Sequence, residues 1–128
     1  MPRVLISDAM DDIAEKILLS NNIEVDVITN FTPEELNKNI NTYDGLIIRS
    51  ATKVTKEVIE NAKHLKVIGR AGAGVDNIDI NTAKEKNIIV MNTPGGNTNA
   101  TAEHTLALSL SLSRKISKAD LTTHKGEW

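Results

Sequence analysis

The stretch Gly69-Arg70-Ala71-Gly72-Ala73-Gly74-Val75-Asp76-Asn77 is the most informative part of this sequence. It follows the apolar run 65–68, which is typical of a buried strand, and places an arginine and closely spaced glycines where a parallel sheet opens toward ligands. Gly72 and Gly74 imitate the start of the dinucleotide fingerprint G-x-G-x-x-G, but Asn77 stands in place of the third glycine. The stretch can therefore hold a nucleotide, bind an acidic substrate, or form only a glycine turn with positive φ.

Around this stretch, short apolar runs alternate with segments of helical pattern. We expect strands at 3–6, 23–28, 45–48, 65–68 and 88–91, and helices at 11–19, 33–40, 55–62 and 80–86. Strands that alternate with helices imply right-handed crossovers and a parallel sheet, and continuous apolar strands are typical of a sheet covered on both faces. The sequence therefore predicts an α/β fold with a flavodoxin-like five-stranded parallel sheet in the order 2-1-3-4-5.

We expect one long helix after this sheet. Asn97, Thr98 and Asn99 are candidate N-caps, and no glycine or proline interrupts 100–121. Leucines at 106, 108, 110 and 112 have the period of a strand, but in a helix they fall on two separate sides. A helix that is apolar on two sides is expected to pack between two bodies, either a second domain or a second subunit, which favours a homo-oligomer.

The composition is that of an ordinary globular domain. The chain has 128 residues, of which 40% are hydrophobic and 25% charged, so one domain with a real core is expected. A net charge of -2 argues against a nucleic-acid surface. There is no cysteine for disulfides or thiolate chemistry, and three scattered histidines argue against a metal site. The N-terminal apolar run is too short for a signal peptide or membrane span, so we expect no membrane partner and a cytoplasmic protein.

Two arginines mark a candidate anion site. Arg49 and Arg70 follow neighbouring strands of the predicted sheet, which lie roughly 4.8 Å apart, so both reach one rim. Their guanidinium groups would repel each other unless an anion lay between them, and a forked donor suits carboxylate or phosphate. Gly72 and Gly74 would let backbone N–H groups approach the same small anionic substrate. Alternatively, each arginine pairs with an acid such as Asp44 or Asp76.

Other titratable residues have simpler expected roles. Asp8 could be half of an acidic pocket, but an acid at this position more often caps or charges the first turn of the next helix. The three histidines are expected at the surface. His104 is adjacent to Glu103 near a helix start, so their side chains diverge and form no catalytic dyad.

Three ordered motifs resemble those of the NAD-dependent D-2-hydroxyacid dehydrogenases: Arg49-Ser50-Ala51-Thr52-Lys53-Val54, the stretch 69–77, and Val90-Met91-Asn92-Thr93-Pro94 with Ala102-Glu103. The resemblance covers the whole chain and is strongest to members that oxidise 3-phospho-D-glycerate to 3-phosphohydroxypyruvate in serine biosynthesis. It implies a substrate-binding domain at 1–97. It also implies that 98–128 is the first helix of a nucleotide-binding domain, which lies at the dimer interface in that family.

The resemblance also implies roles for single residues. Arg49, Ser50 and Arg70 match positions that hold the anionic groups of the substrate. Asn97 matches a position in the interdomain hinge near the substrate. Ala73 matches a position whose backbone meets the nicotinamide end of NAD, where several relatives carry threonine.

The family's G-x-G-x-x-G, its ribose-binding acid and its catalytic Arg, Glu and His have no counterpart in this sequence. None of the three histidines stands in the matching motif. We therefore expect an N-terminal portion of a larger enzyme, without catalytic residues or the main NAD-binding domain, and inactive alone. Alternatives are another D-2-hydroxyacid dehydrogenase, for glyoxylate or lactate, or a free-standing anion-binding or regulatory module. A phospho-acceptor receiver domain fits poorly, because Arg49 stands where that fold needs an aspartate.

Overall fold

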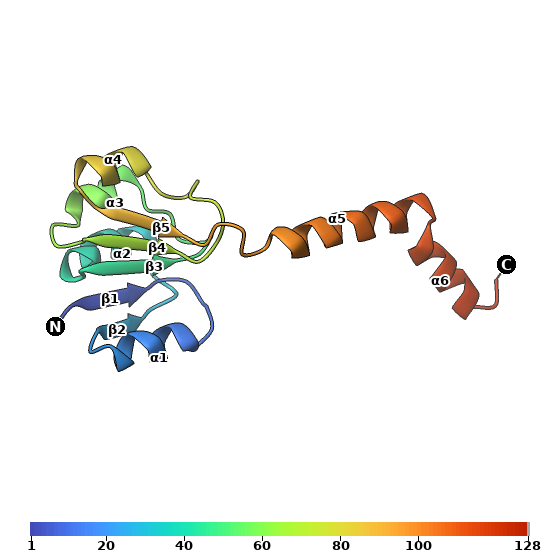
Figure 1. Cartoon of the computed structure of the whole chain (residues 1–128), viewed down its shortest axis with the longest axis horizontal. Helices are drawn as coiled ribbons and strands as arrows, with labels where there is room; N and C mark the ends of the chain where they lie inside the picture. Colours follow the sequence, from blue (N-terminus) through green and yellow to red (C-terminus); the bar gives the residue numbers. More distant parts are fainter. Residues whose placement is uncertain (128) are drawn as a thin grey trace. The chain divides into compact units, whose positions relative to one another are not determined.

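A five-stranded parallel sheet forms the centre of the computed structural model, which describes residues 1–127. Its strands are β1 (Arg3–Ile6), β2 (Glu24–Val27), β3 (Gly45–Ile48), β4 (Val67–Arg70) and β5 (Ile89–Asn92). They pair in the order β2-β1-β3-β4-β5 (Figure 1), which confirms the predicted topology. β4 begins two residues later than expected, so Arg70 is its last residue and pairs with Ile48 of β3.

Four helices connect the strands: α1 (Ile13–Ser20), α2 (Pro33–Asn39), α3 (Lys56–Asn61) and α4 (Ile80–Glu85). A 3-10 turn, η1 (Ile40–Thr42), follows α2. A capping box begins α2, with Glu35 N donating to Thr32 Oγ1 at 3.2 Å and Thr32 N donating to Glu35 Oε2 at 2.8 Å. Side chains of Thr55 and Asp79 likewise accept from backbone N–H groups at the starts of α3 and α4.

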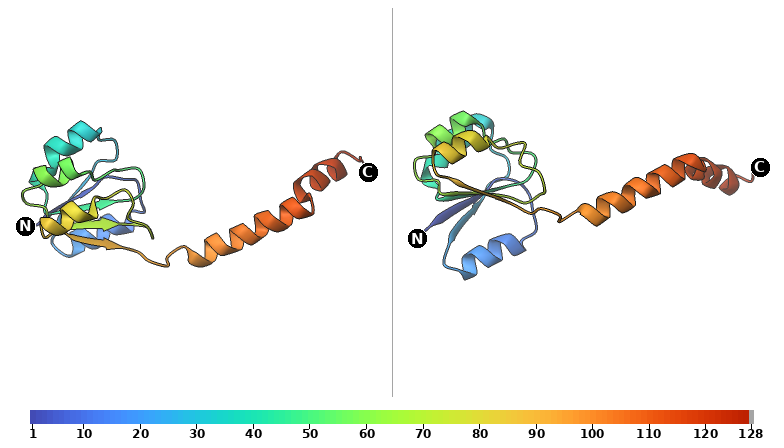
Figure 2. Two further views of the ribbon diagram at one scale, coloured as in Figure 1. Left: turned by 90° about the horizontal axis from the view of Figure 1, so that it is seen from above. Right: turned by 45° about the horizontal axis from the view of Figure 1, so that its top comes forward.

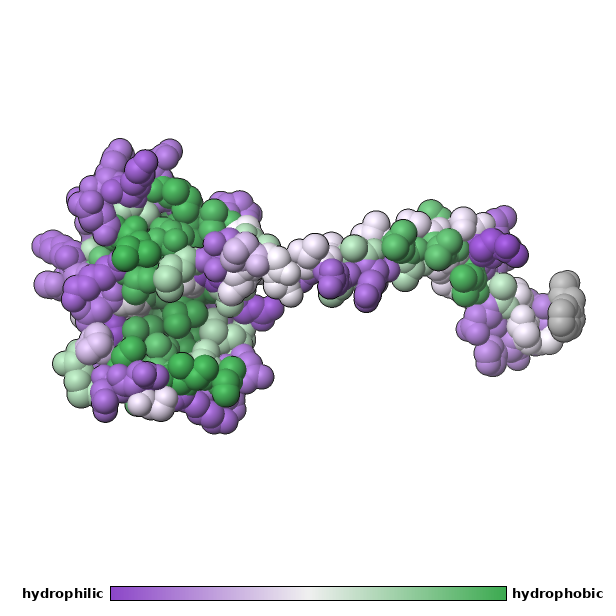
Figure 3. All heavy atoms as spheres, viewed as in Figure 1, coloured by the Kyte–Doolittle hydropathy of each residue, from purple (hydrophilic) through white to green (hydrophobic). Residues whose placement is uncertain are grey.

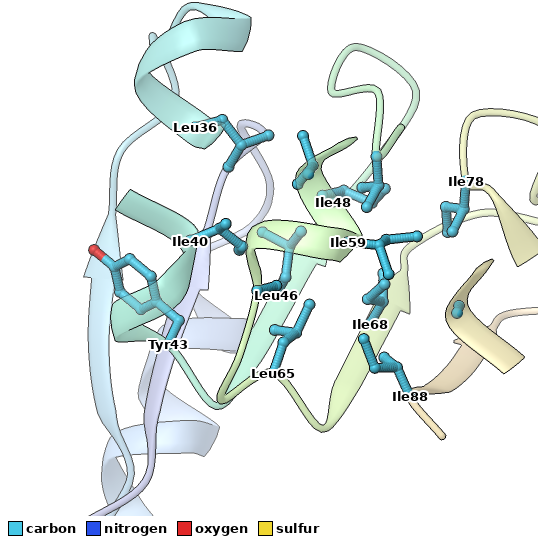
Figure 4. Packing of buried hydrophobic residues seen from close by; sticks show 14 of the residues in the cluster. Leu36, Ile40, Tyr43, Leu46, Ile48, Ile59, Leu65, Ile68, Ile78 and Ile88 are labelled. Carbon is cyan, nitrogen blue, oxygen red and sulfur yellow. The ribbon is translucent and has the colours of Figure 1, made fainter. Parts of the chain in front are cut away.

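The core lies on one face of the sheet. α2, α3 and α4 cover that face, whereas α1 lies on the opposite one (Figure 2). Figure 4 shows packed side chains from the strands, the covering helices and the loops: Leu36, Ile40, Tyr43, Leu46, Ile48, Ile59, Leu65, Ile68, Ile78 and Ile88. Leu5 of β1 belongs to the same cluster. Full burial of one such aliphatic side chain stabilises the fold by about 1.5–3 kcal/mol, so this layer is the main source of stability.

The opposite face is covered only in part. α1 packs beside β2 and contains no buried residue, while Ile89 and Met91 of β5 are 62% and 55% exposed. Figure 3 shows apolar atoms open to solvent on this part of the molecule. Among the described residues, the expectation of a sheet covered on both faces therefore holds for β1, where Val4, Leu5 and Ile6 are all buried, and is wrong for β5.

The chain divides into two compact units, one at Met1–Pro94 and one that begins at Gly95. The second contains α5 (Thr98–Ser113) and α6 (Ile116–His124) in place of the single helix expected. Lys115 separates them with φ 51° and ψ 39°, a left-handed conformation that only a few non-glycine residues adopt. The Ser113 hydroxyl also donates to the Leu110 carbonyl at 3.0 Å, a side-chain bond that competes with regular helix pairing.

Trp128, the last residue of the predicted segment 98–128, lies outside the described residues. Within the described part of the chain, no helix combines the length and the apolar character needed to cross a membrane.

The uneven covering of the sheet predicts unequal costs for two isoleucines on adjacent strands. Ile68 is 0% exposed, so Ile68→Ala leaves a cavity in the core and should lower the free energy of unfolding by about 2–5 kcal/mol. Ile89→Ala, on the open face, should change it by less than about 1 kcal/mol. Urea unfolding followed by circular dichroism measures both. Equal losses would contradict an open face over β5.

Candidate functional site

The loop Arg49–Thr52, which follows β3, is held at both ends. On one side the Asp8 carboxylate accepts hydrogen bonds from Arg49 N at 2.6 Å and from Thr52 N and Oγ1 at 3.2 and 2.7 Å. On the other side Asn77 Nδ2 donates to the carbonyl oxygens of Arg49 and Thr52 at 2.8 and 2.7 Å. Ser50, between these two ends, is exposed at the carboxyl edge of the sheet.

Asp8 is a buried anion whose partners are backbone and hydroxyl groups. It is 6% exposed. Burial raises the pKa of this carboxyl group, but hydrogen bonds from the Thr52 side chain and from the backbone of Arg49, Thr52 and Ala51 outweigh that effect and hold the pKa below its ordinary value. The expected cap of the next helix is therefore wrong. Asp11 Oδ1 accepts from Ile13 N at the start of α1, while Asp8 binds the loop after a neighbouring strand.

Arg70 curls over the glycine-rich loop that follows β4. Its Nη1 donates to the Gly74 carbonyl at 2.7 Å, and its Nε is buried with no partner in the described part of the chain. A Cβ on Gly72 would lie 2.5 Å from Arg70 Nη1, so this glycine leaves room for the guanidinium group. The Gly72 N–H itself donates to the Arg70 carbonyl at 2.9 Å and is not free for a ligand.

The alternative of a glycine turn with positive φ does not hold, because neither Gly72 nor Gly74 is among the described glycines with positive φ. The stretch is a loop, as its sequence suggests, and α4 begins only at Ile80. The close approach of the Arg70 side chain, and not a special backbone conformation, therefore explains why a glycine stands at position 72.

The two arginines reach the same edge but turn to different neighbours. Arg49 Nη1 donates to the Ala9 carbonyl at 3.0 Å, whereas Arg70 binds within its own loop. Neither forms an ion pair with an acid of the described residues, and Asp44 pairs instead with Lys66 at 2.8 Å. The alternative in which each arginine pairs with an acid such as Asp44 or Asp76 therefore does not hold among the described residues. Among the described residues, each guanidinium group has one acceptor, which leaves other N–H donors for an anion.

The remaining predicted residues are exposed. Asn92 Nδ2 donates to the Ala73 carbonyl at 2.7 Å and so steadies the loop next to Arg70. Asn97 stands at the N-cap of α5 without a side-chain cap bond, and it belongs to the second unit, so its role beside the substrate stays a prediction. The histidines are exposed as expected, and no cluster of described His, Asp and Glu residues could hold a metal ion.

Two open hollows lie beside these loops. One of about 590 Å³ is bordered by Ser50, Lys53, Lys56, Asp76 and Asn77, among others. Another of about 660 Å³ lies toward α2 and α3 and is bordered by Asp8 and Thr52. Neither is lined by Arg49 or Arg70.

Similarity to known proteins identifies the family of this chain. The family model described as D-isomer specific 2-hydroxyacid dehydrogenase, catalytic domain, matches residues 4–125. The chain belongs to this family. The sheet edge that carries Arg49 and Arg70 is thus part of a D-2-hydroxyacid dehydrogenase domain.

Among relatives, D-3-phosphoglycerate dehydrogenase of Archaeoglobus fulgidus is 48% identical over 126 residues, which are 98% of this chain and 24% of that protein. The TT0316 protein of Thermus thermophilus is 37% identical with a TM-score of 0.85, over 98% of this chain and 41% of that one. The NAD+-bound 3-phosphoglycerate dehydrogenase of Entamoeba histolytica is 34% identical with a TM-score of 0.74, over 86% and 38%. This member of the family thus spans about a quarter of the length of the curated relative.

Sequence reasoning missed the supporting residues of the site. Asp8, Asn77 and Asn92 hold the arginine-bearing loops through bonds that span 41, 25 to 28, and 19 residues of sequence. The available signal was their position at or after strand ends, which does not say to which loop each side chain reaches.

Loss of the Asp8 charge should weaken the fold in a pH-dependent way. Asp8→Asn should lower the free energy of unfolding at pH 7 by about 2–3 kcal/mol, because buried N–H groups lose a charged acceptor. A carboxyl group with a lowered pKa stabilises the fold above its ordinary pKa of 3.8, and this contribution is lost as the pH falls through the folded value. The difference between wild type and variant should therefore shrink below pH 4, as urea unfolding at pH 7 and pH 3 will measure.

The control for this variant is Asp12→Asn. The Asp12 side chain is 82% exposed, and its ion pair is a long contact of 3.9 Å between Oδ2 and Lys16 Nζ. It should change stability by less than about 0.5 kcal/mol. A difference for Asp8→Asn that stays constant from pH 7 to pH 3 would contradict the role of the charge.

Gly72→Ala should displace the Arg70 guanidinium group with little loss of stability. The new Cβ would meet the far end of a flexible side chain, so the unfolding free energy should fall by less than about 1 kcal/mol. The NMR signals of Arg70 Nε–Hε and the Gly74 amide should move. Gly69→Ala is the matched control, since its Cβ would make an ordinary 3.8 Å contact with Ile47. Unchanged Arg70 signals in Gly72→Ala would refute the close approach.

Proposed function

We propose that this chain is the substrate-binding part of an NAD-dependent dehydrogenase that oxidises 3-phospho-D-glycerate to 3-phosphohydroxypyruvate in serine biosynthesis. The observation that carries the proposal is the pair of arginines at one sheet edge, neither of which is neutralised by an acid of the described chain. The 48% identity to D-3-phosphoglycerate dehydrogenase of Archaeoglobus fulgidus supports this substrate over other D-2-hydroxy acids.

The chemistry of the edge suits a substrate with two anionic groups. Arg49 and Arg70 offer forked donors for carboxylate or phosphate. The Ser50 hydroxyl lies in the loop held by Asp8 and Asn77, so its backbone is already ordered before a ligand arrives. Gly72 contributes by leaving space for Arg70, and this corrects the expectation of an N–H donor.

The described residues fit a minor part of an NAD site. Ala73 is exposed, and the bond from Asn92 to its carbonyl holds its backbone in place, as a contact with the nicotinamide end would need. Bound NAD would accept a hydride from C2 of the substrate. We propose that the acid/base histidine, its glutamate partner and the main nucleotide-binding domain belong to the rest of the protein. This chain then binds substrate without catalysing the reaction.

We propose that residues 1–97 form the substrate-binding domain and that 98–128 begin the nucleotide-binding domain. The apolar residues of α5 and α6 support a homo-oligomeric enzyme in which these helices are covered by a second subunit. We propose that this enzyme is cytoplasmic. Six of them are more than half exposed: Leu106, Leu108, Leu110, Leu112, Ile116 and Leu121. So many exposed large apolar side chains on a short segment mark an interaction surface.

An NMR titration of the 128-residue chain with 3-phosphoglycerate tests the proposed site. Amide signals of residues 49–52 and 70–74 should shift, with weak affinity because much of the enzyme is missing. Arg49→Gln should weaken binding at least about tenfold, since a charge-assisted bidentate contact contributes more than about 1.4 kcal/mol. Lys63→Gln, an exposed charge change in the connection between α3 and β4, should leave binding unchanged.

Two outcomes would contradict the assignment. Equal shifts with chloride, or shifts confined to residues 98–127, would show that the arginine edge does not select this ligand. Tighter binding of lactate or glyoxylate than of 3-phosphoglycerate would favour a dehydrogenase for another D-2-hydroxy acid.

A further inference from the structure

We propose that Asn77 is a positioning residue that joins the two arginine-bearing loops, so that the loop Arg49–Thr52 keeps its anion-binding shape. Asn77 lies in the loop that begins after Arg70, and its side chain reaches the loop after β3. The ligand-binding consequence rests on the proposed function, but the effect on the loop does not.

The Asn77 amide uses both of its hydrogens on this loop. Nδ2 donates to Arg49 O at 2.8 Å and to Thr52 O at 2.7 Å. The reverse orientation would direct Oδ1 at two carbonyl oxygens, so these contacts fix the amide group. Oδ1 is buried without a partner in the described part of the chain. An unsatisfied buried acceptor costs about 1–3 kcal/mol, which the two donated bonds must offset.

Asp8 complements Asn77 across the same loop. The carboxylate binds the N–H groups of Arg49 and Thr52, and the amide binds their carbonyl groups. Arg49 and Thr52, which flank Ser50 and Ala51, are thus each held through both the backbone N–H and the backbone carbonyl group. Such a loop presents its outer residues in a single conformation, and little conformational entropy remains to be lost when a ligand binds.

The backbone near Asn77 is held independently of its side chain. Val54 N donates to Asn77 O at 2.8 Å, Asp79 N donates to Val54 O at 2.9 Å, and Val54 and Ile78 form a parallel bridge. A change in the Asn77 side chain therefore removes the link to Arg49 and Thr52 without releasing the segment. This separates Asn77 from Asp8, whose loss leaves buried donors unpaired and weakens the whole fold.

The experiment compares Asn77→Asp and Asn77→Ala with Asn81→Asp in the 128-residue chain. Asn77→Asp keeps the size of the side chain but replaces the donor with an acceptor that faces two carbonyl groups. Asn81→Asp brings the same charge change to an exposed position in α4. Backbone ¹⁵N relaxation and amide hydrogen exchange report on residues 49–52 without ligand, and an NMR titration gives the affinity for 3-phosphoglycerate.

Both Asn77 variants should increase the mobility of residues 50–52 while the signals of the sheet stay in place. The affinity for 3-phosphoglycerate should fall at least tenfold in Asn77→Asp and by less in Asn77→Ala, whereas Asn81→Asp stays within twofold of wild type. An unchanged loop in both Asn77 variants overturns the proposal. So does a collapse of the whole amide spectrum, which would show a merely structural role.

The two proposals fail separately. If wild type does not bind 3-phosphoglycerate, the proposed function is wrong, and the relaxation data still decide whether Asn77 orders the loop. If wild type binds and the variants bind equally well, the proposed function stands and the role of Asn77 is refuted.

Discussion

Parallel pairing of all five strands is the constraint on which the candidate site depends. Because every strand ends at the same edge, the loops after β1, β3 and β4 meet there although the chain separates them widely. Asp8, Arg49 and Arg70 each stand at or just beyond a strand end. The core that fixes these strands lies on one face, so the edge inherits its geometry from the packing of residues such as Leu46 and Ile68. Ligands of open α/β sheets bind at this kind of edge.

At that edge, hydrogen bonds to the backbone take the place of ion pairs. The Asp8 carboxylate is buried and stays charged because four donor groups surround it, and neither arginine neutralises it. A salt bridge between Asp8 and Arg49 would have used the guanidinium group that the proposed substrate needs. Instead the acid holds the backbone of Arg49 and leaves its side chain resting on one carbonyl. The loop is thus ordered without consuming its binding groups.

Several differences between expectation and structure have physical reasons. The apolar run 65–68 marks burial, whereas pairing with β3 starts only at Val67 opposite Gly45, so the strand is displaced toward Arg70. The leucine pattern of 106–112 contains no glycine or proline to signal the break at Lys115. Ile89 and Met91 are apolar, as core residues are, yet in the described part of the chain they lie on the open face of the sheet. A pattern records that a side chain is apolar and not what covers it.

By itself, the sequence determined the alternation of strands and helices, the parallel order of the sheet and the pair of arginines at one edge. These features depend on the local spacing of apolar residues and on residue types that lie close together in the sequence. Only the tertiary structure decided that Asp8 and Asn77 hold opposite sides of the loop Arg49–Thr52, that Gly72 yields space to Arg70, and that one face of the sheet is left open. The reason is that hydrogen-bond partners separated by 25 to 44 residues are chosen by how strands pack and not by sequence spacing.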